Sequence, residues 1–490
     1  MDESTNWFRS AHYRLTVLSL SVLCLLLLAY PVARAFANID INYNEGWNAY
    51  FQARAINGGT LYSEHSMFFF CNYPPLSFFL VGALGHLLGD PILAGRLVSI
   101  AALALIILTI ARIVRFSGSN QLEALAAASV CLIAFVTFYV DYVGMNDPQL
   151  LGMAFSIGAL GMALCGTGST GRGALVALLI TASLLIKHNL LVVPIIIALD
   201  MWVKGNRRQL TAYTCTGLLS GAVAALWIWA GEGTAFFDQL LLKRTWSAHR
   251  AAFSTAELLM RHQGLAVIAI LGLIGLRTRL SSIILAYALL SLIIGLYFIG
   301  GAGTAANMFY DLVIALSIGF GLVLSRLRST GVPPIALTTA LVAACAGPLI
   351  KAPLMLGVAA KQIGAGLRTE SNALSRDIAF LKAQPGDAFC ESLVLCFRAE
   401  EPMSVDLFNS LQAIETGRLA KTVLSDKIKR HEFSVVQIRY LTMPDSPTSD
   451  ASQALIAAVK NNYHIAQKGI SGDLWIPNQP RPASTSQDQN

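Results

Sequence analysis

Long apolar segments separated by short polar junctions dominate the first 350 residues of the chain. A helix needs about 17 to 25 mostly apolar residues to cross a bilayer, and roughly eleven segments approach that length. These segments are Leu15–Phe36, a run from Ile92, Leu122–Val140, a run after Pro148, Gly173–Ile186, Leu190–Val203, Thr211–Ala230, Leu265–Leu276, runs from Ile283 and Leu312, and Pro333–Ile350. The pattern predicts a polytopic α-helical membrane protein.

Basic side chains mark alternate junctions between these segments. Short loops rich in Arg and Lys remain in the cytoplasm, so these junctions fix the topology. The N-terminus is then cytoplasmic, and the junctions that hold Asp40, Glu45, Asp147, Lys187 and Asn307 face outward. The C-terminal part also lies outside the cytoplasm. We therefore expect a multi-pass protein of the plasma (inner) membrane, with Leu15–Phe36 as an uncleaved first span because it is longer than a signal-peptide core.

Two segments fit this topology less simply. Pro74–Gly89 is apolar but too short to span comfortably, and a full crossing there would invert every later assignment. We expect a re-entrant or membrane-surface helix, with its two prolines at the start, where proline costs no helical hydrogen bond. The longer loop that holds Lys243, Arg244, Arg250 and Arg261 falls on the outer side despite its positive charge.

The composition changes after residue 350, where apolar content falls. Ser392–Phe397 and Ser434–Tyr440 have the character of short strands, and Ala451–Asn461 has that of a helix. The expected domains are therefore a transmembrane catalytic domain (1–350) with a first outer loop (37–90), a small extracytoplasmic α/β domain (351–477), and a disordered tail (478–490) rich in Pro, Ser and Gln.

Overall composition agrees with this membrane assignment. The chain is 55% hydrophobic and 13% charged, and its mean hydropathy is +0.59. The net charge of +7 comes mostly from residues beside the apolar runs, so it reflects membrane topology and not nucleic-acid binding. The eight cysteines form no metal-type cluster in the sequence. Cys390 and Cys396 lie in the polar C-terminal part, where a disulfide is compatible with an oxidising compartment, and the sequence leaves their pairing open.

The outer junctions carry the candidate chemistry. Glu45 lies near the start of an expected helix that ends at Gly58-Gly59, and Asp147 precedes Pro148. Each carboxylate has a simple alternative role as a helix cap. Lys187 and His188 interrupt two apolar runs, where charge is costly unless it is paired or reaches the interface. A lysine that extends toward the headgroups is the plain alternative to a phosphate ligand.

Considered together, these residues place carboxylates and a Lys-His pair on one face of the membrane. A carboxylate base that faces a phosphate-binding cation suits glycosyl transfer from a lipid phosphate. The base would deprotonate the acceptor, and the cation would stabilise the departing phosphate.

The order of these motifs resembles that of the GT-C superfamily of integral-membrane glycosyltransferases. This superfamily includes protein O-mannosyltransferases, the aminoarabinose transferases of lipid A and lipopolysaccharide-core sugar transferases of the rhizobial type. Asn44-Glu45, Gly59 and Pro74-Pro75-Leu76 are similar to the family's Asp-Glu, Gly and Pro-Pro-Leu elements, with Asn44 in place of the aspartate. Asn146-Asp147-Pro148-Gln149 is similar to its second acidic loop.

The resemblance implies a glycosyltransferase that uses a polyprenyl-phosphate sugar and a lipid, glycan or protein acceptor. It implies catalytic roles for Asp147 and for either Glu45 or Asp40 as the base. The residues expected to bind substrate are Tyr73, Lys187, His188 and Asn307. We expect no cofactor and no metal, although Glu45 and Asp147 together offer oxygen ligands for a divalent cation. A secondary transporter and an inactive scaffold or sensor are the alternative functions.

Overall fold

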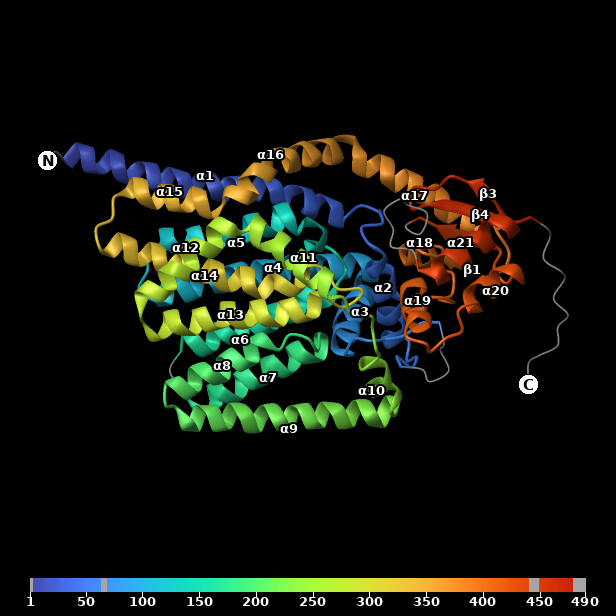
Figure 1. Cartoon of the computed structure of the whole chain (residues 1–490), viewed down its shortest axis with the longest axis horizontal. Helices are drawn as coiled ribbons and strands as arrows, with labels where there is room; N and C mark the ends of the chain where they lie inside the picture. The colour runs from blue at the N-terminus through green and yellow to red at the C-terminus, as the bar shows by residue number, and fades with distance from the viewer. Residues whose placement is uncertain (1–2, 63–67, 167, 440–448, 479–490) are drawn as a thin grey trace.

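The computed structural model of the protein describes residues 3–62, 68–166, 168–439 and 449–478. Helices make up most of these residues. Figure 1 shows a bundle of roughly parallel helices with a small α/β domain at one end. The N-terminus lies at the opposite end of the bundle. The predicted tail lies almost entirely outside the described residues.

The bundle contains the counterparts of all the predicted apolar segments. Its helices are α1 (Glu3–Ala35), α4 (Pro91–Phe116), α5 (Gln121–Phe138), α6 (Pro148–Leu164), α7 (Thr170–Ile186), α8 (Val192–Val203), α9 (Arg207–Glu232), α11 (Ala248–Arg261), α12 (Gln263–Leu276), α13 (Arg279–Ile299), α14 (Tyr310–Ser329), α15 (Pro334–Ala344) and α16 (Ala346–Lys361). Two 3-10 turns, η1 (Val140–Tyr142) and η2 (Ala306–Phe309), and the short helix α10 (Ala235–Leu240) lie in its loops.

Helix lengths confirm a multi-pass architecture without fixing the number of crossings. Among the described residues, six helices are long and apolar enough to cross a membrane. The number rises to eight if each of two bent pairs is one span, namely α11 with α12 and α15 with the continuous helix Ala346–Lys382. Helices α6, α7 and α8 are apolar but only 17, 17 and 12 residues long. The expected total of about eleven spans therefore remains a prediction.

The first outer loop folds into two helices at the end of the bundle nearest the α/β domain (Figure 1). Helix α2 (Tyr43–Ile56) begins at Asn42, whose side chain accepts a hydrogen bond from the backbone N–H of Asn44. It ends before Gly58, whose positive φ of 74° suits a residue without Cβ. Helix α3 (Leu76–Leu88) starts directly after Pro75, and its 13 residues are too few for the span criterion.

The C-terminal domain is built on a four-stranded sheet. Its strands are β1 (Ala388–Cys390), β2 (Val435–Ile438), β3 (Tyr463–Gln467) and β4 (Asp473–Pro477), in the order β1-β2-β4-β3. β1 and β2 are parallel, and the other pairs are antiparallel. Its helices are α18 (Leu393–Arg398), α19 (Leu407–Glu415), α20 (Val423–Lys429) and α21 (Asp450–Asn462).

A long helical arm connects this domain to the bundle. Helix α16 continues through a π-helical turn, η3 (Gln362–Gly366), into α17 (Leu367–Lys382), which ends close to the sheet. The predicted domain boundary at residue 350 thus falls inside a helix, and the first strand begins at Ala388.

One secondary-structure prediction in this domain was wrong. Ser392–Phe397 forms helix α18 and not a strand, because a short apolar run does not by its pattern separate a strand from a buried helical turn. A disulfide between Cys390 and Cys396 ties this helix to the end of β1 and resolves the pairing that the sequence left open.

Close backbone contact fixes the domain to the first outer loop. A Cβ atom on Gly46 of α2 would lie 2.1 Å from the carbonyl carbon of Leu393, so only glycine lets α18 approach this closely. The Tyr50 hydroxyl donates to the carbonyl of Glu401 at 2.6 Å, and Arg398 forms an ion pair with Asp90 at 2.8 Å. These contacts cover the end of the bundle at which the predicted site residues lie.

Candidate active site

A cavity of about 590 Å³ lies at the end of the bundle that the α/β domain covers. Its walls come from the start of α2, the segment before α3, the loops before α6 and α8, the segment from α10 to α11, and the loop between α13 and α14. The polar and aromatic residues that line it are Asn44, Asn72, Tyr73, Tyr142, Asp147, Lys187, His188, Asn189, Arg244, Thr245, Trp246, Tyr297, Phe298, Thr304 and Asn307.

Asp147 and Lys187 form a buried ion pair in the wall of this cavity. The Lys187 Nζ lies 3.6 Å from the Asp147 Oδ1, and the two side chains are only 4% and 3% exposed. The same Asp147 oxygen accepts the backbone N–H of Gln149 at 2.8 Å, and Pro148 occupies the first position of α6. Asp147 therefore caps a helix, as the plain alternative held, and also faces the cavity.

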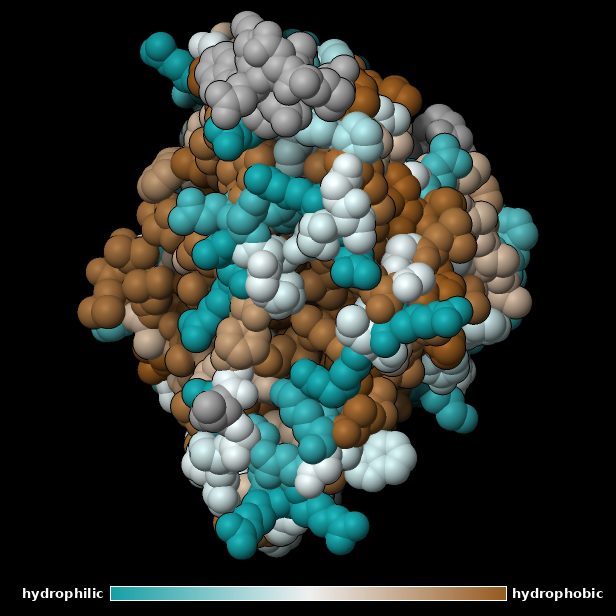
Figure 2. All heavy atoms as spheres, turned by 90° about the vertical axis from the view of Figure 1, so that its left-hand side faces the viewer, coloured by the Kyte–Doolittle hydropathy of each residue, from teal (hydrophilic) through white to brown (hydrophobic). Residues whose placement is uncertain are grey.

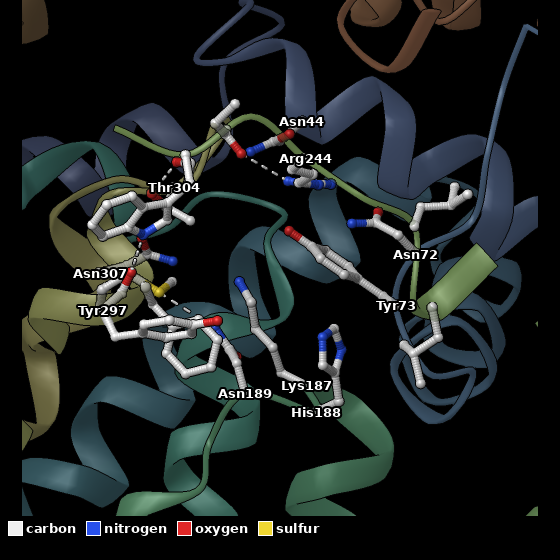
Figure 3. A pocket seen from close by; sticks show the side chains of 18 of the residues that line it. Asn44, Asn72, Tyr73, Lys187, His188, Asn189, Arg244, Tyr297, Thr304 and Asn307 are labelled. Carbon is white, nitrogen blue, oxygen red and sulfur yellow. Dashed lines mark hydrogen bonds between the residues drawn. The ribbon is translucent and has the colours of Figure 1, made fainter. Parts of the chain in front are cut away.

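Tyr73 packs against the same lysine. The Lys187 Nζ lies 4.9 Å from the centre of the Tyr73 ring, an arrangement that favours a cation. Burial alone would lower the pKa of Lys187, but Asp147 and Tyr73 outweigh it and raise that pKa, so the amino group stays charged. Figure 3 shows the Lys187 amino group and the Tyr73 hydroxyl directed into the same space.

Figure 3 shows His188 and Asn307 on opposite sides of Lys187. Burial, Lys187 and Arg244 lower the pKa of His188 to about 4, so its ring is neutral near pH 7. Its Nδ1 atom is buried and has no hydrogen-bond partner among the described residues. The Asn307 side chain donates to the Gln149 side chain at 3.0 Å, which fixes the η2 turn against the start of α6. The unpaired imidazole nitrogen is free to contact a ligand.

Arg244 supplies a second cation from the loop between α10 and α11. Its guanidinium donates to the carbonyl of Ala302 at 3.1 Å and lies 5.6 Å from the ring centre of Phe408 in the α/β domain. Figure 3 places Arg244 and Asn44 together on one side of the cavity, across from Lys187. The positive outer loop that fitted the topology poorly thus contributes a cation to the cavity.

The sequence did not indicate the aromatic rim of the cavity. The Trp246 indole N–H donates to the carbonyl of Tyr297 at 2.8 Å, and both side chains are more than half exposed. Tryptophan and tyrosine are enriched at membrane interfaces. The position of Trp246 and Tyr297 beside polar junctions was therefore the sequence feature that could have indicated this rim.

Glu45 does not line this cavity. Its carboxylate accepts two hydrogen bonds from Arg96, from Nε at 2.8 Å and from Nη2 at 2.6 Å, and the two side chains are 0% and 1% exposed. It also accepts the backbone N–H of Asn146 at 3.0 Å. Gly95 leaves the space for Asn146, since a Cβ there would lie 1.8 Å from the amide oxygen. Arg96 and Asn146 thus hold the Glu45 carboxylate outside the cavity lining, and its role as a base stays a prediction.

Arg96 is a further residue whose role the sequence did not indicate. It interrupts an apolar run and is almost fully buried, and such a charge requires a partner. It also donates to the carbonyls of Ala37 and Ile39 at 2.7 and 2.8 Å, so it joins both sides of the first loop.

Asp40 also lies away from the cavity. Its Oδ2 accepts a hydrogen bond from the Ser392 hydroxyl at 2.5 Å, which places it against the α/β domain. Burial raises the pKa of this carboxyl. Among the carboxylates of the described chain, Asp147 alone lines the cavity.

Comparison with known proteins identifies the fold. The chain matches no family model and no curated protein in sequence. It is similar in structure to ArnT from Cupriavidus metallidurans in the apo state, with a TM-score of 0.64, 13% identity, and coverage of 98% of this chain and 99% of ArnT. The chain has the GT-C fold.

Two further structures agree with this fold. The undecaprenyl phosphate complex of the same ArnT gives a TM-score of 0.62 at 13% identity and covers 95% of this chain and 99% of ArnT. The oligosaccharyltransferase AglB from Archaeoglobus fulgidus, in complex with an inhibitory peptide and a dolichol phosphate, gives 0.55 at 11% identity, with coverage of 98% and 76%. The predicted GT-C resemblance is thus confirmed for the fold.

The donor set of the cavity is poor for a divalent cation. The described residues contain no cluster of three or more His, Cys, Asp and Glu side chains with metal-site geometry. Hard cations such as Mg²⁺ and Ca²⁺ prefer several oxygen ligands, whereas this GT-C cavity offers one carboxylate, already paired with Lys187, and one imidazole. Glu45 is engaged by Arg96 and is not available as the second ligand considered from the sequence. Metal-independent chemistry therefore stays our expectation.

Proposed function

We propose that this chain is a membrane glycosyltransferase that moves a sugar from a polyprenyl-phosphate donor to an acceptor hydroxyl. The observation that carries the proposal is the Asp147–Lys187 pair, which places a carboxylate beside a cation in a cavity at one end of a GT-C bundle. Two of the similar structures, ArnT and AglB, hold undecaprenyl phosphate and a dolichol phosphate, and this supports a lipid-phosphate donor here.

In the proposed reaction, Lys187 and Arg244 bind the donor phosphate. They stabilise the negative charge that develops as the bond between the sugar C1 and the phosphate oxygen breaks. The electron pair of that bond leaves with the lipid phosphate. The acceptor oxygen attacks C1 and forms the new glycosidic bond, and its proton passes to Asp147.

This assignment differs from the resemblance, which implied Glu45 or Asp40 as the base. Asp147 acts as the base because it faces the cavity, whereas Glu45 holds the loop that carries it. Asn44 lines the cavity where the family has an aspartate, and its amide is suited to bind substrate hydroxyls. The unpaired Nδ1 of neutral His188 offers a further hydrogen bond.

Aromatic and apolar residues at the rim suit the lipid and the sugar. Trp246 and Tyr297 are exposed at the edge of the cavity, where a polyprenyl chain would enter from the bilayer. The acceptor, whether lipid, glycan or protein, would approach from the side that the α/β domain covers. The outer face of the plasma membrane, assigned from the positive-inside rule, is part of the proposal.

Transfer of label tests this function. Purified protein is mixed with a radiolabelled polyprenyl-phosphate sugar and an acceptor-containing envelope extract, and the label that remains in the lipid fraction is measured. Wild type should deplete that label. Asp147→Asn should slow the transfer by about 10²- to 10⁴-fold, the usual contribution of a general base, while asparagine still caps α6.

Asp141→Asn is the matched control, because Asp141 belongs to the same loop but its side chain is 76% exposed. It should retain wild-type activity. Uptake of substrate into vesicles without bond cleavage would instead support the transporter alternative. Tight ligand binding without transfer or transport would support the scaffold. Equal activity of wild type and Asp147→Asn would overturn the proposed mechanism.

A further inference from the structure

A second polar cavity lies at the opposite end of the bundle. It has a volume of about 570 Å³ and is lined by Arg14, Arg115 and Arg328, by Asn120 and Gln121, and by Leu18, Leu122 and Leu125. These residues come from α1, the end of α4, the start of α5 and the end of α14. The cavity therefore combines several cations with an apolar wall.

Its position follows from the helices that it shares with the active-site end. Tyr142 of η1, which follows α5, and Asn307 of η2, which precedes α14, line the first cavity. Gln121 and Arg328, at the other ends of α5 and α14, line the second. Helix α5 has 18 residues, which corresponds to about 27 Å at 1.5 Å per residue and matches a hydrocarbon core of about 30 Å. The two cavities thus face opposite leaflets.

This end of the molecule carries the polar surface expected at a membrane interface. Figure 2 shows hydrophilic side chains gathered across its middle, with hydrophobic side chains along its flanks. Leu18 and Leu125 are 51% and 36% exposed, so the apolar wall of the cavity is accessible from the bilayer.

The arginines of this second cavity are not fully neutralised by the protein. Arg328 forms an ion pair with buried Glu123 at 3.0 Å, and that carboxylate also completes the cap of α5. Arg115 donates to the carbonyl of Ser119 at 2.6 Å, a contact that leaves its charge uncompensated. The exposed Arg14 has no hydrogen-bond or ion-pair partner in the described part of the chain. Two positive charges therefore remain around the cavity.

We propose that this cavity binds the headgroup of an anionic phospholipid from the leaflet opposite the active site. A guanidinium binds a phosphate through two parallel hydrogen bonds. Arg14 and Arg115 each retain guanidinium N–H donors that can form such bonds. Basic pockets between transmembrane helices are suited to acidic lipid headgroups. The exposed leucines contact the acyl chains, which a soluble phosphate could not use. This site is separate from the proposed transfer reaction and does not depend on it.

Lipid titration monitored by native mass spectrometry tests the site. The delipidated full-length protein in detergent is titrated separately with phosphatidylglycerol and phosphatidylcholine, and the dissociation constant of the first bound lipid is measured. Phosphatidylglycerol should bind more tightly. The double variant Arg14→Gln with Arg115→Gln should weaken its binding about 25-fold, since each arginine near a lipid headgroup contributes about fivefold.

Two variants separate a built site from general charge attraction. Arg207→Gln with Arg208→Gln removes two exposed arginines from the start of α9, outside the cavity, and should leave the first dissociation constant within about twofold of wild type. Arg14→Lys with Arg115→Lys keeps the charge and should retain the preference for phosphatidylglycerol. Melting temperatures confirm that every variant is folded.

Three results would overturn the proposal. The first is equal binding of both phospholipids by wild type, and the second is an equal loss of affinity in the two glutamine variants. The third is displacement of phosphatidylglycerol by millimolar inorganic phosphate, which would show that the cavity recognises a free anion and not a lipid.

Discussion

Replacing Glu45 by glutamine separates a positioning residue from a base. The carboxylate of Glu45 and the guanidinium of Arg96 share two hydrogen bonds of 2.6 and 2.8 Å, and neither side chain is more than 1% exposed. Removal of one partner from such a buried pair leaves an uncompensated charge and costs about 3–5 kcal/mol. For a chain of 490 residues, with an unfolding entropy of about 2.1 cal/mol/K per residue, that loss corresponds to a fall in melting temperature of roughly 3–5 °C.

The same variant should lose activity for an indirect reason. Glu45 accepts the backbone N–H of Asn146, the residue before Asp147, so a displaced carboxylate moves the base. Loss of activity alone therefore does not identify the role of Glu45. The double variant Glu45→Leu with Arg96→Met removes both charges and tests the ion pair, whereas the rate–pH profile of Glu45→Gln tests the role of Glu45.

The double variant should be more stable than the sum of its single changes predicts. Arg96 also donates to the carbonyls of Ala37 and Ile39, so losing both contacts still costs about 2–4 kcal/mol. Each single change costs about 3–5 kcal/mol, so the cost of the double variant should be about 4–6 kcal/mol smaller than the sum of the two single costs.

Two measurements on the same preparations decide the question. Stability is measured as the temperature at which half of the detergent-purified protein is lost from the monodisperse peak in size-exclusion chromatography. Activity is measured as label transfer at 20 °C. Glu45→Gln should fall in both, and its residual transfer should keep the acidic limb of the wild-type rate–pH profile, because the proposed base Asp147 is still present. A Glu45→Gln protein of unchanged stability without activity, or one whose residual transfer has lost that acidic limb, would refute the positioning role.

Three further outcomes follow from the same geometry. Gly46→Ala should detach the α/β domain and increase its release by limited proteolysis, because the new Cβ would lie 2.1 Å from Leu393. The control variant Gly357→Ala, at an open helical position, should not increase this release. Equal release from both variants would contradict the contact between Gly46 and Leu393. The pKa of His188 is lowered to about 4, so its imidazole is already neutral above about pH 5 and His188→Asn should not change the shape of the rate–pH profile between about pH 5.5 and 8. Loss of an inflection near pH 6.5 in that variant would show that the histidine titrates normally. Dialysis against EDTA should leave transfer unchanged because the cavity offers one carboxylate and one imidazole, and activity that Mg²⁺ or Mn²⁺ restores would contradict a metal-independent reaction.

The sequence predicted the fold well because membrane helices depend on local composition. Each apolar run became a helix, since a bilayer leaves helices and closed barrels as the spanning structures. The alternation of basic junctions placed the polar loops at one end. Tyr73, Asp147, Lys187, His188 and Asn307 accordingly lie around one cavity.

The roles of the carboxylates depend on contacts that no local pattern encodes. Glu45 and Arg96 are 51 residues apart, and only the packed structure shows that they form a pair. The motif position suggested a base, whereas the structure buries Glu45 against Arg96 outside the cavity lining, and its support role is part of our proposal. Arg96 lies within an apolar run, where a charge needs a partner. Its presence there was the sequence feature that could have predicted a buried acidic partner.

The C-terminal domain shows the same limit at a smaller scale. Ser392–Phe397 has the apolar residues of a strand, but packing against α2 and the Cys390–Cys396 disulfide accompany a helix there. The glycine that permits the close approach, Gly46, lies more than 340 residues earlier in the chain.

A structure of the protein with bound polyprenyl phosphate tests the central claim most directly. The claim is that the cavity around Asp147 and Lys187 holds the donor phosphate. Density for the phosphate should lie between Lys187 and Arg244, with the prenyl chain leaving past Trp246 and Tyr297. A phosphate held elsewhere, with this cavity closed to it, would contradict the account.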